Sequence, residues 1–269
     1  MIPERDQRIL LDLAHVADQA GIRFFIIGAG ARLLMHDWAL GVSGGRTTTD
    51  WDIAVQVPSW VEFERFRTTL LDFGDGAFAA GRTAHQLLHR MGGSVDIIPF
   101  GNLEVPAGTI TWPSDGQQMS VAVFSACESL CQSVDLPGGI TIRAATVPAL
   151  VVMKAHAHAE RFVRGESRDL RDIDFLLRTY AEHFEEERIF DLAASLLASG
   201  ELLIDDAGAY LLGADIAASL DLPVLEPLHS LILQAAETYG TIVDTLVGPT
   251  WDDGEDALRR AAWLVRRPL

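Results

Sequence analysis

The first half of the chain consists of short apolar runs between polar turns, and the second half consists of longer segments with helical spacing. Short apolar runs that end at glycine, proline or polar residues predict strands, whereas apolar residues that recur with the period of a helix predict helices. The expected strands are 23–27, 51–57, 84–90, 94–99, 118–124 and 140–144. The expected helices are 3–20, 59–73, 126–133, 148–163, 167–180 and 184–198, with several more up to residue 267.

This order of elements predicts an α/β (α+β) fold in two parts. Residues 1–145 are expected to form a palm built on a mixed sheet with helices, and residues 146–269 a helical C-terminal lobe. A chain of 269 residues is long enough to bury the cores of two such lobes. We expect substrate to bind in the cleft between them.

Two aspartates, Asp50 and Asp52, stand at the beginning of the expected strand 51–57. Residues two apart in a strand point to the same face, so both carboxylates are aimed at one point. Two anions held this close repel each other unless a cation lies between them, and Mg²⁺ prefers carboxylate and phosphate oxygens. The pair therefore predicts a metal site. A second Asp-x-Asp, at Asp172 and Asp174, falls in an expected helix, where the carboxylates diverge.

Asp96 is the only charged residue in the apolar run 94–99. A charge in a strand needs a partner. If this strand pairs beside the strand of Asp50 and Asp52, the three carboxylates can hold two Mg²⁺ ions about 3.5 to 4 Å apart, which activate an attacking oxygen and stabilise a leaving one. The alternative interpretation of Asp96 is a surface charge on an edge strand.

A glycine turn follows the first expected strand. The run 23–27 ends at Gly28, and helical spacing begins directly afterwards and continues to Trp38. Glycines at a strand-to-helix turn let backbone N–H groups approach a phosphate closely, and the positive end of the helix dipole favours the anion. Alone, Gly-x-Gly also describes an ordinary tight turn. Combined with the aspartates downstream, it points to nucleotidyl transfer.

The segment 46–52, Arg-Thr-Thr-Thr-Asp-Trp-Asp, completes a pattern of strand, glycine turn, helix and Asp-x-Asp. This pattern resembles the nucleotidyltransferase superfamily of the DNA polymerase β type. More narrowly, it is similar to the bacterial AbiEii/AbiGii branch, which includes toxins of toxin–antitoxin and phage-defence pairs. Members of that branch carry a lysine on a later helix and then Arg-Asp-x-x-Asp, and Lys154 and the segment 168–172 occupy those places here. The resemblance covers residues 21–177.

This resemblance implies an Mg²⁺-dependent enzyme that moves an NMP from an NTP to an acceptor hydroxyl on RNA, tRNA, protein or a small molecule. It implies two Mg²⁺ ions, with Mn²⁺ as a substitute, and a cognate antitoxin as partner. The implied catalytic and metal-binding residues are Asp50, Asp52 and Asp96. The implied NTP-binding residues are Gly28, Ala29, Gly30, Arg46, Thr49 and Lys154. Ala29 departs from the Gly-Gly or Gly-Ser of the superfamily, so any phosphate contact there must come from backbone.

Lys154 is the only lysine in the chain, against twenty arginines. A compact ammonium, kept where arginine is the usual cation, suits a triphosphate. The alternative is a surface lysine that extends its amine to solvent. Asp169 and Asp172 are one helical step apart, and with Arg168 they are expected to brace two helices.

The net charge of −17, from 21 basic and 38 acidic residues, argues against extended binding to RNA. A polyanion gains most of its affinity from Lys and Arg contacts to phosphate. A local basic rim at the metal site is still compatible with the sequence. Its candidate cations are Arg32, Arg46, Arg82, Arg143, Lys154, Arg161, Arg164 and Arg168. An acidic surface equally suits a small-molecule acceptor or a basic partner protein.

The sequence shows no membrane or secretion signal and contains only two cysteines. No segment approaches the roughly 18 uninterrupted apolar residues that a membrane span needs, and the N-terminus lacks a signal-peptide pattern. We therefore expect a cytoplasmic protein that does not enter a membrane. Cys127 and Cys131, the only cysteines, are expected on one helix as inert thiols, because a zinc site needs four ligands.

Two further functions are consistent with the sequence. One is a catalytically silent binding or regulatory protein that keeps the superfamily fold, which Ala29 and the negative charge favour. The three retained carboxylates count against it, because a binding protein has no reason to keep mutually repelling groups together. The other is an antibiotic-type small-molecule nucleotidyltransferase, which shares the chemistry and differs in acceptor.

Overall fold

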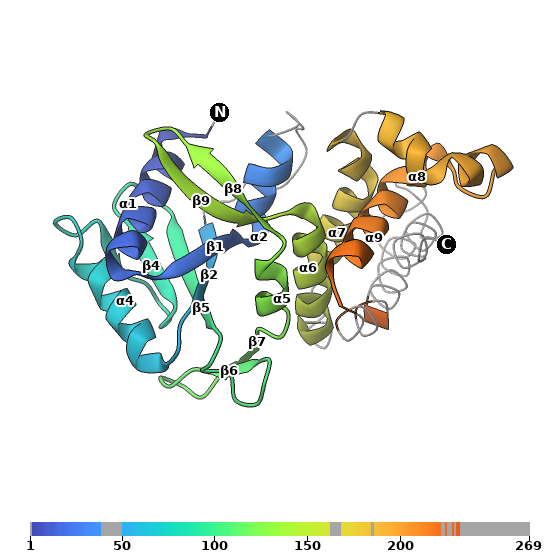
Figure 1. The fold of residues 1–269 in the computed structure, drawn as a ribbon. Helices are drawn as coiled ribbons and strands as arrows, with labels where there is room; N and C mark the ends of the chain where they lie inside the picture. Colours follow the sequence, from blue (N-terminus) through green and yellow to red (C-terminus); the bar gives the residue numbers. More distant parts are fainter. Residues whose placement is uncertain are drawn as a thin grey trace, which may run out of the picture. The chain divides into compact units, whose positions relative to one another are not determined.

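The computed structural model describes residues 2–38, 50–161, 168–183, 186–221, 224, 228, 230 and 231. The chain forms two compact units, residues 1–146 and 147–269. The first is built on a seven-stranded mixed sheet, and the described part of the second is helical, so the predicted fold class is confirmed (Figure 1). Among the helices of the described ranges, none combines the length and the apolar character that crossing a membrane requires.

The elements of each unit follow the chain in a simple order. Those of the first unit are α1 (Glu4–Ala20), β1 (Arg23–Ile27), α2 (Gly28–Arg32), the π-helix η1 (Leu33–Asp37), β2 (Asp50–Gln56), α4 (Trp60–Asp72), β3 (Phe78–Ala80), β4 (Gln86–His89), β5 (Ser94–Phe100), β6 (Thr109–Thr111), β7 (Gln118–Ser120), α5 (Phe124–Glu128), β8 (Cys131–Leu136) and β9 (Ile140–Ala145). Those of the second unit are α6 (Val147–Arg161), α7 (Arg168–Thr179), the 3₁₀ turn η3 (Tyr180–His183), α8 (Glu186–Ser199), the 3₁₀ turn η4 (Ile204–Asp206) and α9 (Ala207–Ser219).

The main sheet has the strand order β3-β4-β5-β2-β1-β9-β8. Strands β2 and β5 run parallel, as do β1 and β9, and the other neighbours are antiparallel. The central strands are apolar on both faces, as expected for strands that are covered on both sides. In β5 every side chain except that of Asp96 is buried. The charged position in this strand is therefore an exception that needs an explanation.

Helix α1 is held to the sheet by apolar packing and by one buried polar contact. Its inward residues Ile9, Leu13 and Val16 are fully buried. On the same helix, Asp12 accepts a hydrogen bond from Nε2 of His89 on β4 at 3.2 Å. The backbone N–H of Met91 donates to Nδ1 of the same ring, so the proton of the neutral imidazole is at Nε2. Burial lowers the pKa of His89, which favours this neutral form.

We expect the substitution Asp12→Ala to lower the free energy of unfolding by about 1–3 kcal/mol, because it leaves the buried Nε2–H group of His89 without an acceptor. The measurement is urea unfolding followed by circular dichroism. Asp18→Ala is the matched control, since Asp18 is exposed on the same helix. Equal effects of the two substitutions would show that the buried contact contributes nothing.

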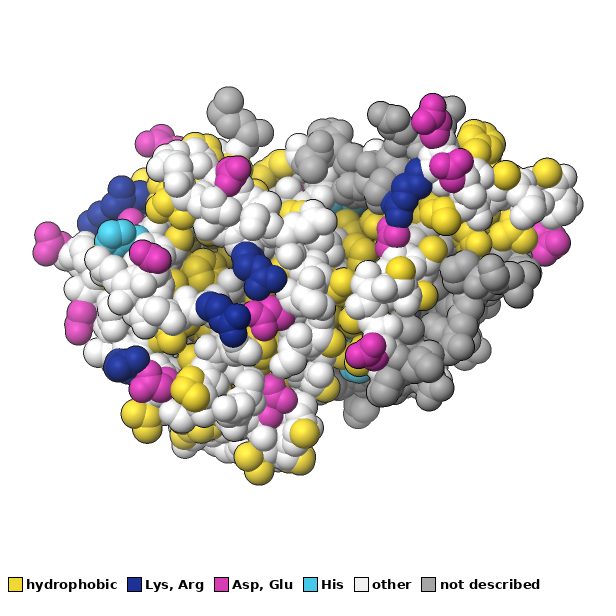
Figure 2. All heavy atoms as spheres, in the orientation of Figure 1, with side chains coloured by type: hydrophobic (Ala, Val, Ile, Leu, Met, Phe, Trp, Pro, Cys, Tyr) yellow, Lys and Arg dark blue, Asp and Glu magenta, His cyan; other side chains and the backbone are white. Residues whose placement is uncertain are grey.

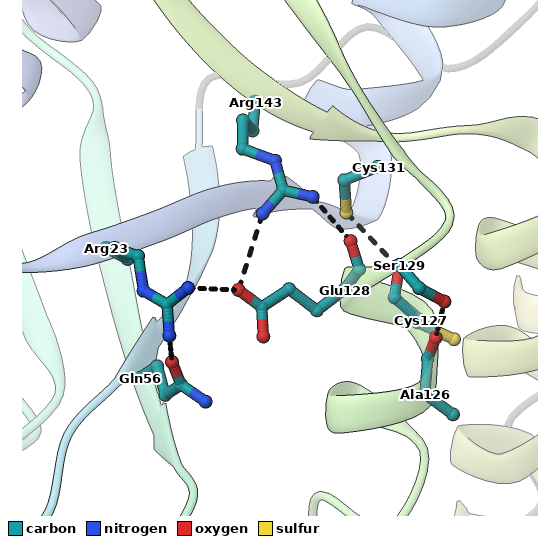
Figure 3. A network of polar contacts seen from close by, with 8 residues as sticks. All are labelled: Arg23, Gln56, Ala126, Cys127, Glu128, Ser129, Cys131 and Arg143. Atoms are coloured by element: carbon teal, nitrogen blue, oxygen red, sulfur yellow. Dashed lines mark hydrogen bonds and ion pairs between the residues drawn. The ribbon is translucent and has the colours of Figure 1, made fainter.

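Helix α5 is fixed to the sheet by a network around Glu128, which Figure 3 shows from close by. Arg143 on β9 donates to the carboxylate of Glu128 at 3.3 Å and to its carbonyl oxygen at 2.6 Å. Arg23 on β1 lies 3.8 Å from the same carboxylate and also donates to Gln56. The network joins α5 to three strands of the sheet.

The expected helix 126–133 is wrong in its second half. Helix α5 ends at Glu128, and Cys131–Leu136 form the edge strand β8, which pairs with β9. Cys127 is buried, and Cys131 donates from its thiol to the carbonyl oxygen of Cys127. Burial raises the pKa of both thiols, that of Cys131 to about 12, which disfavours the thiolate form.

The helix expected after the glycine turn is α-helical only as far as Arg32. It continues as the π-helix η1, whose i→i+5 pattern brings residues five apart to one side. Arg32 and Asp37 have this spacing, and their charged groups lie 3.4 Å apart in the interior. His36 contacts the same carboxylate at 3.2 Å. A buried polar cluster therefore accompanies the departure from α-helical geometry.

Helices α6, α7 and α9 pack on one another in the second unit. Gly208 on α9 lies so close to α7 that a Cβ there would be 2.6 Å from the carbonyl oxygen of Leu177. Tyr180 donates to Asp215 on α9 at 2.6 Å. The tight approach explains why a glycine occupies this helical position.

Candidate active site

Asp52 and Asp96 lie opposite each other on two adjacent parallel strands. Strand β2 pairs with β5 so that Asp52 is the register partner of Asp96, and Asp50 is the partner of Ser94. Register partners on neighbouring strands point to the same face, as do residues two apart along one strand. Asp50, Asp52 and Asp96 therefore share one face of the sheet.

The glycine turn lies directly beside this face. Ile27, the last residue of β1, is the register partner of Asp52, so the chain turns at Gly28 next to that carboxylate. A Cβ on Gly28 would lie 3.2 Å from Cγ of Asp52 and closer still to its Oδ2. Gly28 also has a φ of +64°, which favours glycine. The Asp52 carboxylate therefore occupies the space that a side chain at position 28 would fill.

Gly30 has a corresponding role toward Trp51. A Cβ on Gly30 would lie 2.6 Å from Cε3 of the indole, on the face opposite to the carboxylates. Ala29, between the two glycines, is half-buried in the short helix α2. Each glycine of the turn thus makes room for one residue of the Asp-Trp-Asp segment. This packing role is separate from the phosphate contact predicted for the turn.

Asp96 is the most unusual of the three carboxylates. Burial raises the pKa of its carboxyl group above the ordinary value. His85 and a side-chain hydrogen bond from Gln86 oppose this effect, and the negative charge of Asp50 adds to it. Its Oδ1 atom is buried and has no hydrogen-bond partner among the described residues. A buried acceptor of this kind calls for a ligand or a cation.

Asp50 lies at the exposed first position of β2. Ser94 donates from its hydroxyl to Oδ1 of Asp50 at 2.9 Å and is itself buried. The contact joins the start of β2 to the start of β5, where the carboxylates lie. Ser94 was not among the predicted site residues, although its position two residues before Asp96 could have indicated it.

The donor chemistry of this face fits a hard divalent cation. Three carboxylates on adjacent strand positions, one of them with an unsatisfied buried oxygen, are the ligand type that Mg²⁺ takes. The side chains are not gathered around a point, however. In the part of the chain that the structure describes, no group of three or more His, Cys, Asp or Glu side chains could hold a metal ion. The three carboxylates therefore share a face of the sheet without forming such a group among the described residues.

Two of the predicted NTP-binding residues, Arg46 and Thr49, lie outside the described residues. The third predicted cationic or polar contact, Lys154, is on α6 in the second unit and is 8% exposed. Its Nζ lies 2.5 Å from Asp172 and 3.7 Å from Asp169, both on α7. The lysine therefore braces α6 against α7, which is the role predicted for the two aspartates.

Several cations that were candidates for a basic rim already have acidic partners. Arg32 is buried beside Asp37, Arg143 binds Glu128, and Lys154 binds Asp172, whereas Arg82 is exposed. Figure 2 likewise shows basic side chains (blue) next to acidic ones (magenta) in several places on the face drawn. Such pairing reduces the positive potential available to a polyanion.

The sequence matches one family model, that of the nucleotidyl transferase AbiEii toxin of the type IV toxin–antitoxin system, over residues 44–202. This range is more than half of the chain. The comparison with curated proteins finds no match.

Distant similarities to solved structures accompany the family match. A solution structure of the antibiotic-resistance factor ANT(2'')-Ia has a TM-score of 0.38 and 14% identity, covering 72% of this chain and 92% of that chain. A crystal structure of the same factor with adenylyl-2''-tobramycin has a TM-score of 0.36 and 14% identity, covering 72% and 97%. The CCA-adding enzyme of Thermotoga maritima in complex with tRNA has a TM-score of 0.29 and 10% identity, covering 98% and 79%.

Proposed function

This protein belongs to the AbiEii family of nucleotidyl transferases, and from that premise we propose that it moves an NMP from an NTP to an acceptor hydroxyl in an Mg²⁺-dependent reaction. The observation that supports this reaction most is the shared face on which Asp52, its register partner Asp96 and the turn at Gly28 lie together. Such a transfer needs carboxylates that can hold divalent cations next to a turn that can approach phosphates.

Asp50, Asp52 and Asp96 would hold the Mg²⁺ ions, or Mn²⁺ in their place. When bound, these ions neutralise the triphosphate and stabilise both the attacking and the leaving oxygen. The unsatisfied Oδ1 of Asp96 supports its part in this ligand set. The backbone of residues 28–30, with Arg46, Thr49 and Lys154, would orient the triphosphate.

Asp96 would also accept the proton of the acceptor hydroxyl. Its buried Oδ1 atom has no hydrogen-bond partner among the described residues, so this oxygen can accept a proton. The acceptor oxygen forms a bond to the α-phosphorus, and the bond from that phosphorus to the bridging oxygen breaks. Pyrophosphate leaves with the electron pair, and the acceptor keeps the NMP.

We propose further that the protein is the toxin of a type IV toxin–antitoxin pair, with RNA, tRNA, a protein or a small molecule as acceptor. The family match supports the toxin role. The net charge of −17 and the paired arginines favour an acceptor that needs few phosphate contacts.

The test of the reaction uses two labels on the same NTP. The protein is incubated with Mg²⁺, each of the four NTPs, and separate acceptor fractions of RNA, protein and small molecules. We expect label on the α-phosphate to appear in one acceptor fraction, and label on the γ-phosphate to appear only in pyrophosphate. Binding of NTP in calorimetry without transfer to any fraction would instead support a silent binding protein.

The toxin role has its own test, independent of the acceptor. Induced expression of the protein in a bacterial host should slow growth, while expression of the Asp52→Asn variant at the same level should not. Normal growth of cells that express the active protein would reject the toxin role but not the proposed transfer reaction.

Lys154 can be separated from its bracing role by a paired substitution. We expect Lys154→Met combined with Asp172→Leu to raise the KM for NTP about tenfold, because a charge contact to triphosphate contributes about 1.4 kcal/mol or more. The apolar pair replaces the 2.5 Å ion pair between α6 and α7. Because Asp169, 3.7 Å from the lysine, keeps its carboxylate, thermal unfolding of the double variant checks that the helices remain packed. An unchanged KM in the double variant would mean that Lys154 does not contact the triphosphate and only joins α6 to α7.

A further inference from the structure

Trp51 stands between the two aspartates of β2 and points to the opposite face of the sheet. Its side chain is among the largest that are fully buried, with 1% of the residue exposed. The indole Nε1 donates a hydrogen bond to Oδ1 of Asp6 at 3.3 Å. Asp6 belongs to α1, so the contact joins the first helix of the chain to the strand that carries the carboxylates.

The acceptor of this hydrogen bond is itself held in place. Asp6 is 4% exposed, and Arg5 donates to the same Oδ1 from Nε at 3.0 Å and from a terminal nitrogen at 2.8 Å. The arginine balances the charge of the buried carboxylate, since an unpaired buried charge would be costly. Trp51 therefore meets an acceptor that is held in place.

The other edge of the indole meets the glycine turn. A Cβ on Gly30 would lie 2.6 Å from Cε3 and 2.8 Å from Cζ3 of Trp51. The ring is thus confined between a hydrogen-bond acceptor on α1 and the backbone of α2. Neither confinement is needed for burial alone, which an aliphatic residue would also achieve.

We propose that Trp51 is a positioning residue for the transfer reaction. Successive side chains of a strand alternate between its faces, so the direction of Trp51 sets the directions of Asp50 and Asp52. Asp6 and Gly30 fix the indole, and the indole fixes the two carboxylates on the face that they share with Asp96. The inference rests on the proposed function, because it assigns Trp51 a role in that reaction.

The experiment compares two tryptophan-to-phenylalanine substitutions in the intact protein. Trp51→Phe keeps an aromatic ring and removes the N–H donor. Trp60→Phe is the control, because Trp60 on α4 packs with Phe63 and Trp112, at centroid distances of 5.6 Å and 5.2 Å, and Trp112 in turn contacts His85. The readouts are Mn²⁺ affinity, measured by electron paramagnetic resonance on the protein alone, and kcat per folded molecule for NMP transfer.

We expect Trp51→Phe to weaken Mn²⁺ binding about tenfold and to lower kcat by about tenfold, at the lower end of the effects of residues that orient metal ligands. Trp60→Phe should leave both values within twofold of the wild type, whatever its effect on thermal stability. Equal Mn²⁺ affinity and equal kcat for the two variants would overturn the positioning role.

A second pair of variants tests Asp6, the acceptor of the indole hydrogen bond, and does not require that Trp51→Phe folds. Asp6→Asn keeps an oxygen that accepts from the indole and should stay within threefold of the wild type. Asp6→Leu removes it and should match the losses of Trp51→Phe. Equal effects of the two would reject the hydrogen bond as the positioning contact. A wild-type protein that neither binds Mn²⁺ nor transfers NMP would instead overturn the proposed function itself, and the positioning role with it.

Discussion

Replacing Asp52 with asparagine should lower NMP transfer by about a thousandfold or more, because cation binding to carboxylates supplies several kcal/mol of charge stabilisation in such reactions. Asp52 is central to the shared face: it contacts the turn at Gly28 and is the register partner of Asp96. The asparagine side chain has nearly the same shape but no charge, so it fills the space beside Gly28 without binding a divalent cation comparably. The measurement is transfer of α-phosphate label at saturating NTP.

The fold should survive this substitution. Asp52 is half-buried in a strand whose neighbours are apolar, and removal of one of three like charges on a face relieves repulsion. We expect the melting temperature to be unchanged or slightly raised. Asp135→Asn is the control for loss of a carboxylate in the same sheet, since Asp135 is exposed on the edge strand β8. Retained transfer by Asp52→Asn would exclude Asp52 from the reaction.

The sequence predicted the central strands well because their signals are local. The run 23–27 is bounded by a glycine on its C-terminal side, and β1 has the same limits. The strand expected at 94–99 is one residue shorter than β5. Apart from Arg23, Ser94 and Asp96, the residues of both runs are apolar, and so short an apolar run favours a strand.

The outer strands of the sheet were harder to predict, because they form through pairing with strands elsewhere in the chain and their own sequences show no clear period. Cys127 and Cys131 have helical spacing, yet Cys131 begins β8, which exists through its antiparallel pairing with β9. The three-residue strands β3 and β6 carry too few residues to show a period. Tertiary context decides such segments.

The site shows the same division between local and distant information. The alternation of a strand places Asp50 and Asp52 on one face, and this follows from sequence alone. That Asp6, 45 residues away, accepts a hydrogen bond from Trp51 does not follow from any local pattern. The reasons for Gly28 and Gly30 are also partly hidden in sequence, because the atoms that need their space belong to Asp52 and Trp51, more than twenty residues further along the chain.

Gly28→Ala should lower kcat for transfer by about a hundredfold, because a carboxylate displaced by about 1 Å loses its productive geometry. The added Cβ would collide with Oδ2 of Asp52, and that carboxylate would have to move. The φ of +64° adds a backbone cost of about 1–2 kcal/mol for any residue with a side chain. Transfer of α-phosphate label and urea unfolding measure the two effects separately.

Gly21→Ala separates the backbone cost from the collision. Gly21 has a φ of +65°, nearly that of Gly28, and a Cβ there would meet nothing within 4 Å. Both substitutions should therefore carry a similar backbone cost, whereas only Gly28→Ala should lower kcat. In the background of Asp52→Asn, Gly28→Ala should cause little further loss, because both changes act through the same carboxylate. A wild-type kcat for Gly28→Ala, or an equal loss for Gly21→Ala, would mean that the position of Asp52 beside the turn is irrelevant to the reaction.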